Sequence, residues 1–271
     1  MVDKVLNTVA YIEEKINDFR PDWGIILGTD LGGLVNEIEI VHTFHYRDIP
    51  NFPESTVESH KGLLIFGYLS GQKVVAMQGR FHYYEGYTMD QVTFPVRVMK
   101  FLGIRRLIIS NASGGVNPDY EIGDIMILND HINLMPNPLI GENIAMLGSR
   151  FPDMSEPYDK KMIDTGQEIA KRLKIRCHTG CYVGLTGPTL ETPKEYQYVR
   201  IIGGDVVGMS TVPEVIVARH MSLPCFAVSI ITDLGVPGKI KEVGISDVVN
   251  AAGEAEPKMT EMIKELIMVT V

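Results

Sequence analysis

The stretch V-V-G-M-S-T-V-P-E-V-I-V-A-R-H, residues 206–220, decides the fold class because it joins a buried strand directly to a helix. Val206 and Val207 end an apolar, β-branched run of the kind that forms central strands. Gly208 then lets the chain turn, and an amphipathic helix is expected to begin shortly after it. A strand that runs into a helix in this way is typical of α/β proteins.

The start of that helix predicts an anion site. Thr211 and Glu214 have the spacing of a capping box, and Pro213 lies in the first turn, where its missing N–H costs nothing. This pairing would leave the Ser210 hydroxyl free beside a helix N-terminus, whose N–H groups and dipole favour an anion. A strand–turn–helix joint without a ligand is the alternative interpretation of this stretch alone.

Glycines also follow two other predicted strands. The strand 23–27 leads into G-T-D-L-G-G (28–33), and the strand 106–110 leads into N-A-S-G-G (111–115), which we interpret as a second glycine turn. Such turns let backbone N–H groups approach a phosphate. Neither has the lysine of a Walker loop or the spacing of a dinucleotide-binding motif. Because ligands of α/β sheets bind beyond the carboxyl ends of strands, the turns are expected to meet at one site.

The segment Q-G-R-F-H-Y-Y-E-G-Y (78–87) supplies groups that suit a phosphate. It follows a predicted hairpin over 62–77. Arg80 and His82 alternate, so they project to one side of an extended chain, and Tyr84 is expected to continue on that side. A guanidinium beside an imidazole is a favourable pair for phosphate oxygens. A solvated sheet edge is the alternative.

Two carboxylates are candidates for chemistry. Asp233 follows the apolar strand 224–232, at a carboxyl end where ligands bind. Glu191 directly precedes a second capping box, formed by Thr192 and Glu195. The alternatives are a helix or loop cap for Asp233 and an exposed loop side chain for Glu191.

The remaining pattern predicts one α/β domain over residues 1–271. The segment 44–61 is expected to be an irregular, mobile loop, and Pro257 is expected to kink or break the last helix. The predicted helices are 3–19 (ended by Pro21), 88–102, 160–173 and 246–269, and further strands are 125–134 and 178–185.

Composition excludes several classes of protein. The net charge of −9 argues against binding to a nucleic-acid backbone. No apolar run reaches the length of a membrane span, and residues 1–20 lack the apolar centre of a signal peptide. The cysteines Cys177, Cys181 and Cys225 are too few for a disulfide framework or a zinc site, so we expect buried thiols in a reducing cytoplasm.

Together these stretches resemble the trimeric, low-molecular-mass family of purine nucleoside phosphorylases. The resemblance implies a single α/β domain with a central mixed sheet flanked by helices, a homotrimer, and reversible phosphorolysis of a purine nucleoside in purine salvage. It also implies that inorganic phosphate is a co-substrate and that no cofactor or metal is needed. The matching motifs occur in family order at 28–33, 78–87, 111–115, 187–192 (G-P-T-L-E-T) and 208–220.

The resemblance also implies residue roles. His82, Glu191 and Asp233 would be catalytic. Phosphate would be bound by Thr29, Arg80, His82, Ala112 and Ser210. The ribose would be bound by His60, Tyr84, Met209 and Phe151 of a neighbouring subunit, with Ile245 in the pocket for the 5′-substituent. The base would be bound by Ser113, Gly114, Leu190, Glu191, Thr232 and Asp233.

The sequence departs from the family at the base and the 5′-position. Asp233 replaces an asparagine, which makes the choice between 6-oxo and 6-amino purines open, and Asp30 replaces a glycine. Ile245 stands where the family has a histidine, and an apolar residue at this position resembles methylthioadenosine phosphorylases. Glu191 and Gly235 argue against methylthioadenosine as the substrate. The alternatives are therefore a 5′-methylthioadenosine or methylthioinosine phosphorylase, a non-catalytic nucleoside- or phosphate-binding protein, and a nucleosidase that uses water.

Overall fold

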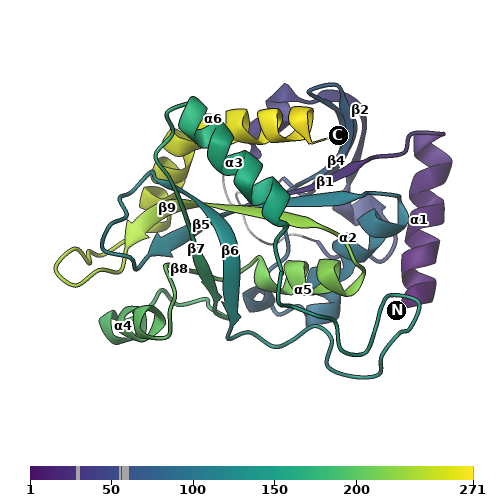
Figure 1. Cartoon of the computed structure of the whole chain (residues 1–271). Helices are drawn as coiled ribbons and strands as arrows, with labels where there is room; N and C mark the ends of the chain where they lie inside the picture. Colours follow the sequence, from purple (N-terminus) through teal and green to yellow (C-terminus); the bar gives the residue numbers. More distant parts are fainter. Residues whose placement is uncertain (29–30, 55, 57–60, 271) are drawn as a thin grey trace.

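The computed structural model describes residues 1–28, 31–54, 56 and 61–270. Its nine described strands form one mixed sheet in the order β2-β3-β4-β1-β5-β8-β7-β6-β9, and β5 also pairs with β9 (Figure 1). The strands are β1 Trp23–Leu27, β2 Glu39–His45, β3 Leu63–Leu69, β4 Gln72–Gln78, β5 Arg106–Gly115, β6 Ile125–Asn133, β7 Cys177–Gly184, β8 Val206–Gly208 and β9 Cys225–Leu234. The α-helices are α1 Val2–Ile16, α2 Met89–Phe101, α3 Lys160–Arg172, α4 Pro193–Ile201, α5 Val212–His220 and α6 Ile245–Val269.

Strand β5 is the branch point of the sheet. It pairs in parallel with β1 and β9 and antiparallel with β8. Because β9 also pairs with β6, the strands β5, β8, β7, β6 and β9 close on themselves. Strands β4, β1, β5 and β9 run parallel to one another, so their carboxyl ends lie at one edge of the sheet. That edge is where α/β sheets bind ligands.

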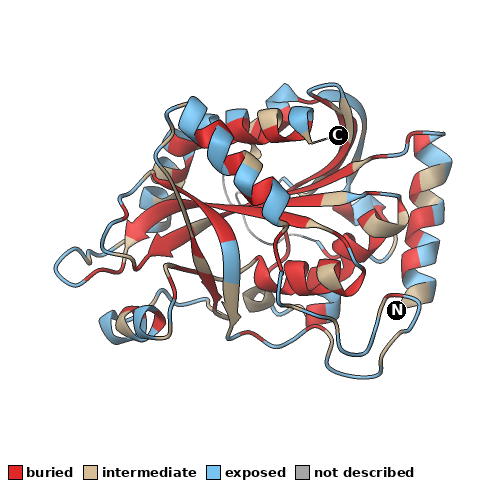
Figure 2. Cartoon of the chain, in the orientation of Figure 1, coloured by how far each residue is buried: buried red, intermediate tan, exposed pale blue. Residues whose placement is uncertain are grey.

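Helices cover both faces of this sheet. Figure 1 shows α3 and α6 on one face and α2 and α5 on the other, and each pair is in mutual contact. The strands between them are buried on both faces, as the red ribbon of Figure 2 shows, and β1 and β9 are therefore apolar runs without alternation. Helix α4 lies at the margin of the molecule, and most of its residues are exposed. In the described part of the chain, no helix is both long and apolar enough to span a membrane.

Several local predictions are confirmed. Strands β3 and β4 form the predicted hairpin, and Thr88 with Gln91 forms a capping box at the start of α2. Thr192 with Glu195 does the same for α4, with Pro193 at its first position. Of the cysteines expected to be buried thiols, Cys225 is buried, whereas Cys177 and Cys181 are partly exposed.

Other predictions are wrong at the level of single segments. Residues 111–115 are not a turn but the end of β5, because Gly114 and Gly115 pair with β8 and, past a bulge, with β9. Of the kink or break expected at Pro257, the break is absent, because α6 runs through that residue, and the kink stays a prediction. Helix α1 ends at Ile16, ahead of Pro21, with Asn17 in a positive-φ conformation. Strand β2 reaches into the segment expected to be an irregular loop, whose residues 55 and 57–60 lie outside the described part.

Candidate active site

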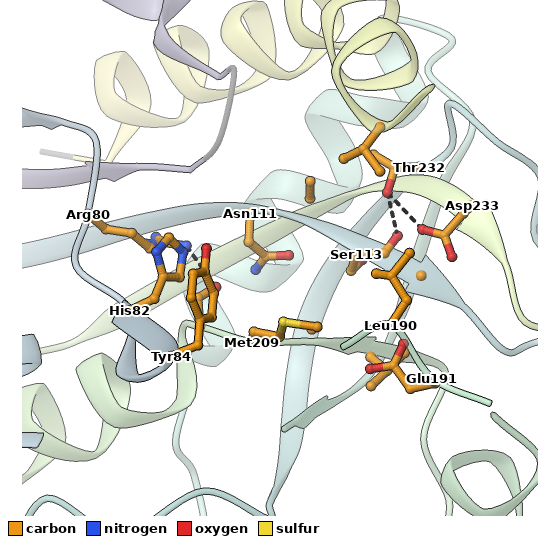
Figure 3. A pocket seen from close by; sticks show the side chains of 16 residues that line it. Arg80, His82, Tyr84, Asn111, Ser113, Leu190, Glu191, Met209, Thr232 and Asp233 are labelled. Carbon is orange, nitrogen blue, oxygen red and sulfur yellow. Dashed lines mark hydrogen bonds between the residues drawn. The ribbon is translucent and has the colours of Figure 1, made fainter. Parts of the chain in front are cut away.

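A single pocket at the carboxyl ends of β5 and β9 brings most of the predicted site residues together (Figure 3). Figure 3 shows Arg80, His82 and Tyr84 at one end, Glu191 and Asp233 at the other, and Met209 between them. The predicted residues that line it are Arg80, His82, Tyr84, Ala112, Ser113, Gly114, Leu190, Glu191, Met209, Ser210, Thr232 and Asp233. The pocket is also lined by Asn111, Val207, Gly208 and Val248, to which the sequence analysis gave no role in binding.

The other predicted residues are not placed in this pocket. Thr29, His60 and Asp30 lie outside the described residues. Ile245 is the first residue of α6, and its side chain is not described. Phe151 is 87% exposed and lines a different pocket, so the prediction that it serves a neighbouring subunit is untested in the single chain.

Arg80 is the fixed cation of the site. It follows β4 through Gly79, whose positive φ turns the chain toward the pocket, and only 1% of Arg80 is exposed. Its Nη1 donates to Ser210 Oγ at 2.9 Å, and its Nε lies 3.3 Å from Glu214 Oε1. Burial raises the pKa of Glu214, and the positive charge of Arg80 opposes that rise. The buried ion pair holds the guanidinium in one orientation at the end of the pocket.

The start of α5 differs from the predicted capping box. Thr211 has φ 63° and ψ −55°, and its side chain does not cap the helix. Val212 N donates to Ser210 O at 2.6 Å, which closes a γ-turn centred on Thr211. A β-branched residue in this conformation costs on the order of 1–3 kcal/mol, a strain that is typical of functional sites. Glu214, the expected capping partner, pairs with Arg80, and a hydrogen bond from the Thr211 backbone also lowers its pKa.

The strained turn places Thr211 in a chain of hydrogen bonds that orients Ser210. Ser229 Oγ donates to Asn111 Oδ1 at 2.7 Å, and Asn111 Nδ2 donates to Thr211 Oγ1 at 3.0 Å. Thr211 Oγ1 lies 3.1 Å from Ser210 Oγ, so its own proton can go to Ser210. Because Ser210 Oγ also accepts from Arg80, the Ser210 proton is directed away from both of these partners. The Tyr182 hydroxyl also lies 3.5 Å from Ser210 Oγ, and either oxygen can be the donor. The Ser210 hydroxyl is thus engaged within the protein rather than free, and its proton can go to Tyr182 or to a bound anion.

His82 is held by Glu85. The Glu85 carboxylate accepts from the His82 backbone N–H at 2.7 Å and lies 3.1 Å from its Nδ1. It also accepts from the backbone and hydroxyl of Thr56, and these hydrogen bonds outweigh burial and lower the Glu85 pKa to about 2. Burial lowers the pKa of His82, which favours a neutral ring with its Nδ1 proton donated to Glu85.

Tyr84 lies beside His82, as expected, but the backbone between them is not the predicted extended chain. The two rings stack with centroids 4.6 Å apart, although Tyr84 belongs to the short 3-10 helix Tyr83–Glu85. Burial raises the Tyr84 pKa to about 12, so its hydroxyl stays protonated as a donor.

The opposite end of the pocket is acidic. Asp233 lies opposite Gly114 in the β5–β9 ladder and is 6% exposed. It receives hydrogen bonds from the hydroxyl groups of Tyr196 at 3.2 Å and Thr232 at 3.1 Å. Burial raises the pKa of Asp233. Burial also raises the pKa of Glu191, and the nearby Asp233 charge adds to the rise. For both carboxyl groups, burial thus favours the protonated form more than in an exposed carboxyl group.

The arrangement joins a donor-rich end for an anion to an end where carboxyl groups can accept or donate hydrogen bonds. Within the described ranges, no group of three or more His, Cys, Asp or Glu residues is arranged to hold a metal ion. The chemistry that this pocket supports is therefore positioning of an anion against a polar organic ligand.

Comparison with known proteins agrees with this geometry. A sequence model described as the phosphorylase superfamily matches residues 22–268. Purine nucleoside phosphorylase 1 of Geobacillus stearothermophilus is 54% identical over 83% of this chain and 82% of that protein. Purine nucleoside phosphorylase 1 of Bacillus subtilis is 46% identical over 98% of both chains. The crystal structure of Schistosoma mansoni purine nucleoside phosphorylase with inosine has a TM-score of 0.94 at 39% identity, covering 100% of this chain and 97% of that one. The chain therefore belongs to the phosphorylase superfamily.

Proposed function

We propose that the chain is a purine nucleoside phosphorylase, which converts a purine ribonucleoside or deoxyribonucleoside and phosphate reversibly to free base and pentose 1-phosphate in purine salvage. The observation that carries the proposal is the pocket itself. It sets Arg80, Ser210 and His82 at one end and Glu191 and Asp233 at the other. The similar proteins named above, which span nearly the whole chain, support the same activity.

Phosphate would be the nucleophile, so no serine or cysteine attack is required. Arg80 and the Ser210 hydroxyl would hold it, with His82 and the backbone of Ala112, beneath the anomeric carbon. Thr29 would complete this site from outside the described residues. The bond from sugar to base breaks through an oxocarbenium-like sugar, as in glycoside cleavage. Fixing the attacking oxygen at that carbon supplies much of the rate, because the reaction becomes effectively unimolecular.

The departing purine gains negative charge, and donors at the base end would stabilise it more than they stabilise the nucleoside. Glu191 would accept from N1–H of a 6-oxopurine. Asp233 would donate to N7 in its protonated form, which burial favours. Leu190, Ser113, Gly114 and Thr232 would shape the rest of the base pocket.

A protonated aspartate has one acceptor and one donor, as an asparagine amide has, whereas an ionised one accepts only. Protonated Asp233 would therefore suit a 6-oxopurine and ionised Asp233 a 6-aminopurine. Structures of the Schistosoma mansoni phosphorylase have been determined with adenosine as well as inosine, and that protein is 39% identical to this chain. We propose 6-oxopurine nucleosides as the preferred substrates, with adenosine accepted more weakly.

Tyr84 and Met209 would contact the ribose, with His60 above it. Val248 lines the pocket one helical turn after Ile245, which supports placing Ile245 at the 5′-end. The apolar Val248 also favours a second candidate, a phosphorylase of 5′-methylthioadenosine or methylthioinosine.

We further propose a homotrimer in the cytoplasm. Phe151, Ile140 and Met146 are large apolar side chains that are mostly exposed, and an interface between copies would bury them. Phe151 would then reach the ribose site of a neighbouring subunit, which requires a closed ring of head-to-tail contacts. The free thiols suit a reducing compartment.

The test is base release from inosine, guanosine, adenosine and methylthioadenosine, each with and without phosphate. The proposal expects phosphate-dependent release that is fastest with inosine or guanosine. Preferential release from methylthioadenosine would establish the second candidate instead. Release without phosphate would indicate a nucleosidase, and binding without release would indicate a non-catalytic protein.

A further inference from the structure

Tyr196 is a buried side chain behind the base end of the pocket that none of the roles above uses. It lies in α4, is 5% exposed, and does not line the pocket. Its hydroxyl donates to Asp233 Oδ2 at 3.2 Å, and it also acts on the Glu191 carboxylate. One phenolic group thus hydrogen-bonds to Asp233 and also lowers the pKa of Glu191.

The Tyr196 ring is held in this position by its surroundings. It packs in a small apolar cluster with Val116, Val183, Val199 and Val207. A Cβ added at Gly235 would overlap the ring, so this glycine leaves the space that the tyrosine fills. The Gly235 backbone is itself fixed, since its N–H donates to Gly115 O at 2.8 Å. The space that the ring fills is therefore bounded by the fixed backbone at the end of β9.

Two hydroxyl groups, those of Thr232 and Tyr196, can donate a hydrogen bond to Asp233. Thr232 Oγ1 lies 3.1 Å from Asp233 Oδ1 and 3.3 Å from Ser113 O, but it has one proton to donate (Figure 3). Thr232 divides its single proton between these two acceptors, so the Tyr196 hydroxyl adds a second donor to Asp233. Donation to a carboxylate favours its ionised form, whereas burial opposes it.

On the basis of the proposed function, we propose that Tyr196 is a positioning residue that sets the purine preference. The hydrogen bond from Tyr196 fixes the Asp233 carboxyl group and favours the ionised form of that group. An ionised Asp233 accepts from the 6-amino group of adenosine. Without Tyr196, Asp233 would hold a proton to higher pH and act as the donor that a 6-oxopurine needs. Tyr196 thus widens the substrate range toward 6-aminopurines.

The charged surroundings of Asp233 are few. Glu191 precedes α4, and Glu195 within α4 acts on Glu191. Strand β5 contributes Ser113 and Gly114, and α6 contributes Val248, none of which titrates between acidic and neutral pH. Of the groups that the structure describes here, Thr232 and Tyr196 donate protons to Asp233, and Glu191 is the carboxyl group whose pKa responds to the Asp233 charge.

The experiment measures kcat/KM for inosine and adenosine from pH 5 to pH 9 in wild type and Tyr196→Phe. We expect the inosine-to-adenosine ratio to rise about three- to tenfold at neutral pH, the scale of one ordinary hydrogen bond. The pH at which the ratio changes should move upward by about one unit. KM for phosphate should stay unchanged. Tyr198→Phe is the matched control, because Tyr198 lies on the same helix and is 50% exposed.

Gly235→Ala provides an independent variant. Its methyl group would overlap the Tyr196 ring and displace it from its present position, so it should shift the ratio in the same direction as Tyr196→Phe. Equal losses for both substrates, with the ratio and its pH profile unchanged in both variants, would overturn the inference and leave Tyr196 a packing residue. Absence of phosphate-dependent release in wild type would instead overturn the proposed function. The affinities of the variants for hypoxanthine and adenine then test the role of Tyr196 without turnover. A hypoxanthine-to-adenine affinity ratio equal to that of wild type would overturn the inference.

Discussion

The two ends of the pocket are built on different physical principles. At the phosphate end, Arg80 is locked by Glu214 and Ser210, and a chain of hydrogen bonds from Ser229 orients the serine. At the base end, the carboxyl groups of Asp233 and Glu191 share a tyrosine donor and have raised pKa values. One end has a fixed charge, whereas the charge of the other depends on protonation.

This difference indicates which property each end controls. A fixed cation at the end of a strand can bind an anion in one orientation at any physiological pH. Carboxyl groups with raised pKa values can change from donor to acceptor, so they suit the choice among bases. Changes at the phosphate end should therefore affect every substrate alike, and changes at the base end should affect the ratio between substrates.

The largest expected effect comes from Arg80→Ala. The kcat/KM for phosphate should fall more than a hundredfold, chiefly through KM, because the fixed cation is lost. The variant should also lose about 3–5 kcal/mol of stability, since Glu214 is left as an unpaired buried charge. Phosphate titrations of initial rate, with thermal unfolding, measure both effects. In the double variant Arg80→Met with Glu214→Gln, stability should recover and phosphate affinity should not. A normal KM for phosphate in Arg80→Ala would place the anion elsewhere.

Ser210→Ala should lower kcat/KM by about ten- to a hundredfold for inosine and adenosine alike, because one oriented donor to the phosphate is lost. Ser229→Ala, at the far end of the same hydrogen-bond chain, should give a smaller loss in the same direction. Steady-state rates with both nucleosides measure these effects. A change in the ratio of the two substrates would contradict the separation of the two ends.

Asp233→Asn should raise the inosine-to-adenosine ratio of kcat/KM about tenfold, because the amide has the donor and acceptor that a 6-oxopurine needs at every pH. KM for phosphate should not change. The same assays over pH 5–9 should show that the ratio no longer depends on pH. An unchanged ratio would mean that Asp233 stands clear of the base.

Glu85→Gln should have the smallest effect on turnover, about tenfold or less, through looser orientation of His82. Its effect on stability has a clear pH window. The folded pKa of Glu85 is about 2 against an ordinary value of 4.5, so its contribution is present above pH 4.5 and is lost as the pH falls toward 2. Urea unfolding should show wild type more stable than Glu85→Gln at pH 7, with the gap narrowing at pH 3. A gap that widens in acid would contradict this sign.

The fold and the phosphate end were largely predictable from the sequence. Period-two spacing placed Arg80 and His82 together, and the strand ends indicated a common site edge. The predicted glycine turn at 111–115 was wrong because a strand bulge and long-range pairing with β8 and β9 override the local glycine signal. The capping box at Thr211 is only half formed: Glu214 keeps its interaction with the Thr211 backbone, but the Thr211 hydroxyl bonds with Asn111 and Ser210 rather than with the helix.

The base end shows the limit of sequence reasoning more clearly. Asp233 and Glu191 were found from their positions after a strand and before a cap, but Tyr196 reads as an ordinary residue of an amphipathic helix. Its role depends on a contact across 37 positions of sequence with Asp233. Asn111 was quoted as part of a glycine-rich motif, yet its partner Ser229 is brought close only by the parallel pairing of β5 and β9. Such contacts have no local sequence signal.

The most direct test of the account is the fate of the ribose in inosine cleavage, followed by 31P NMR together with hypoxanthine absorbance. The account predicts ribose 1-phosphate and hypoxanthine in equal amounts, with no release when phosphate is omitted. Free ribose as the product, or an equal rate of hypoxanthine release without phosphate, would contradict it.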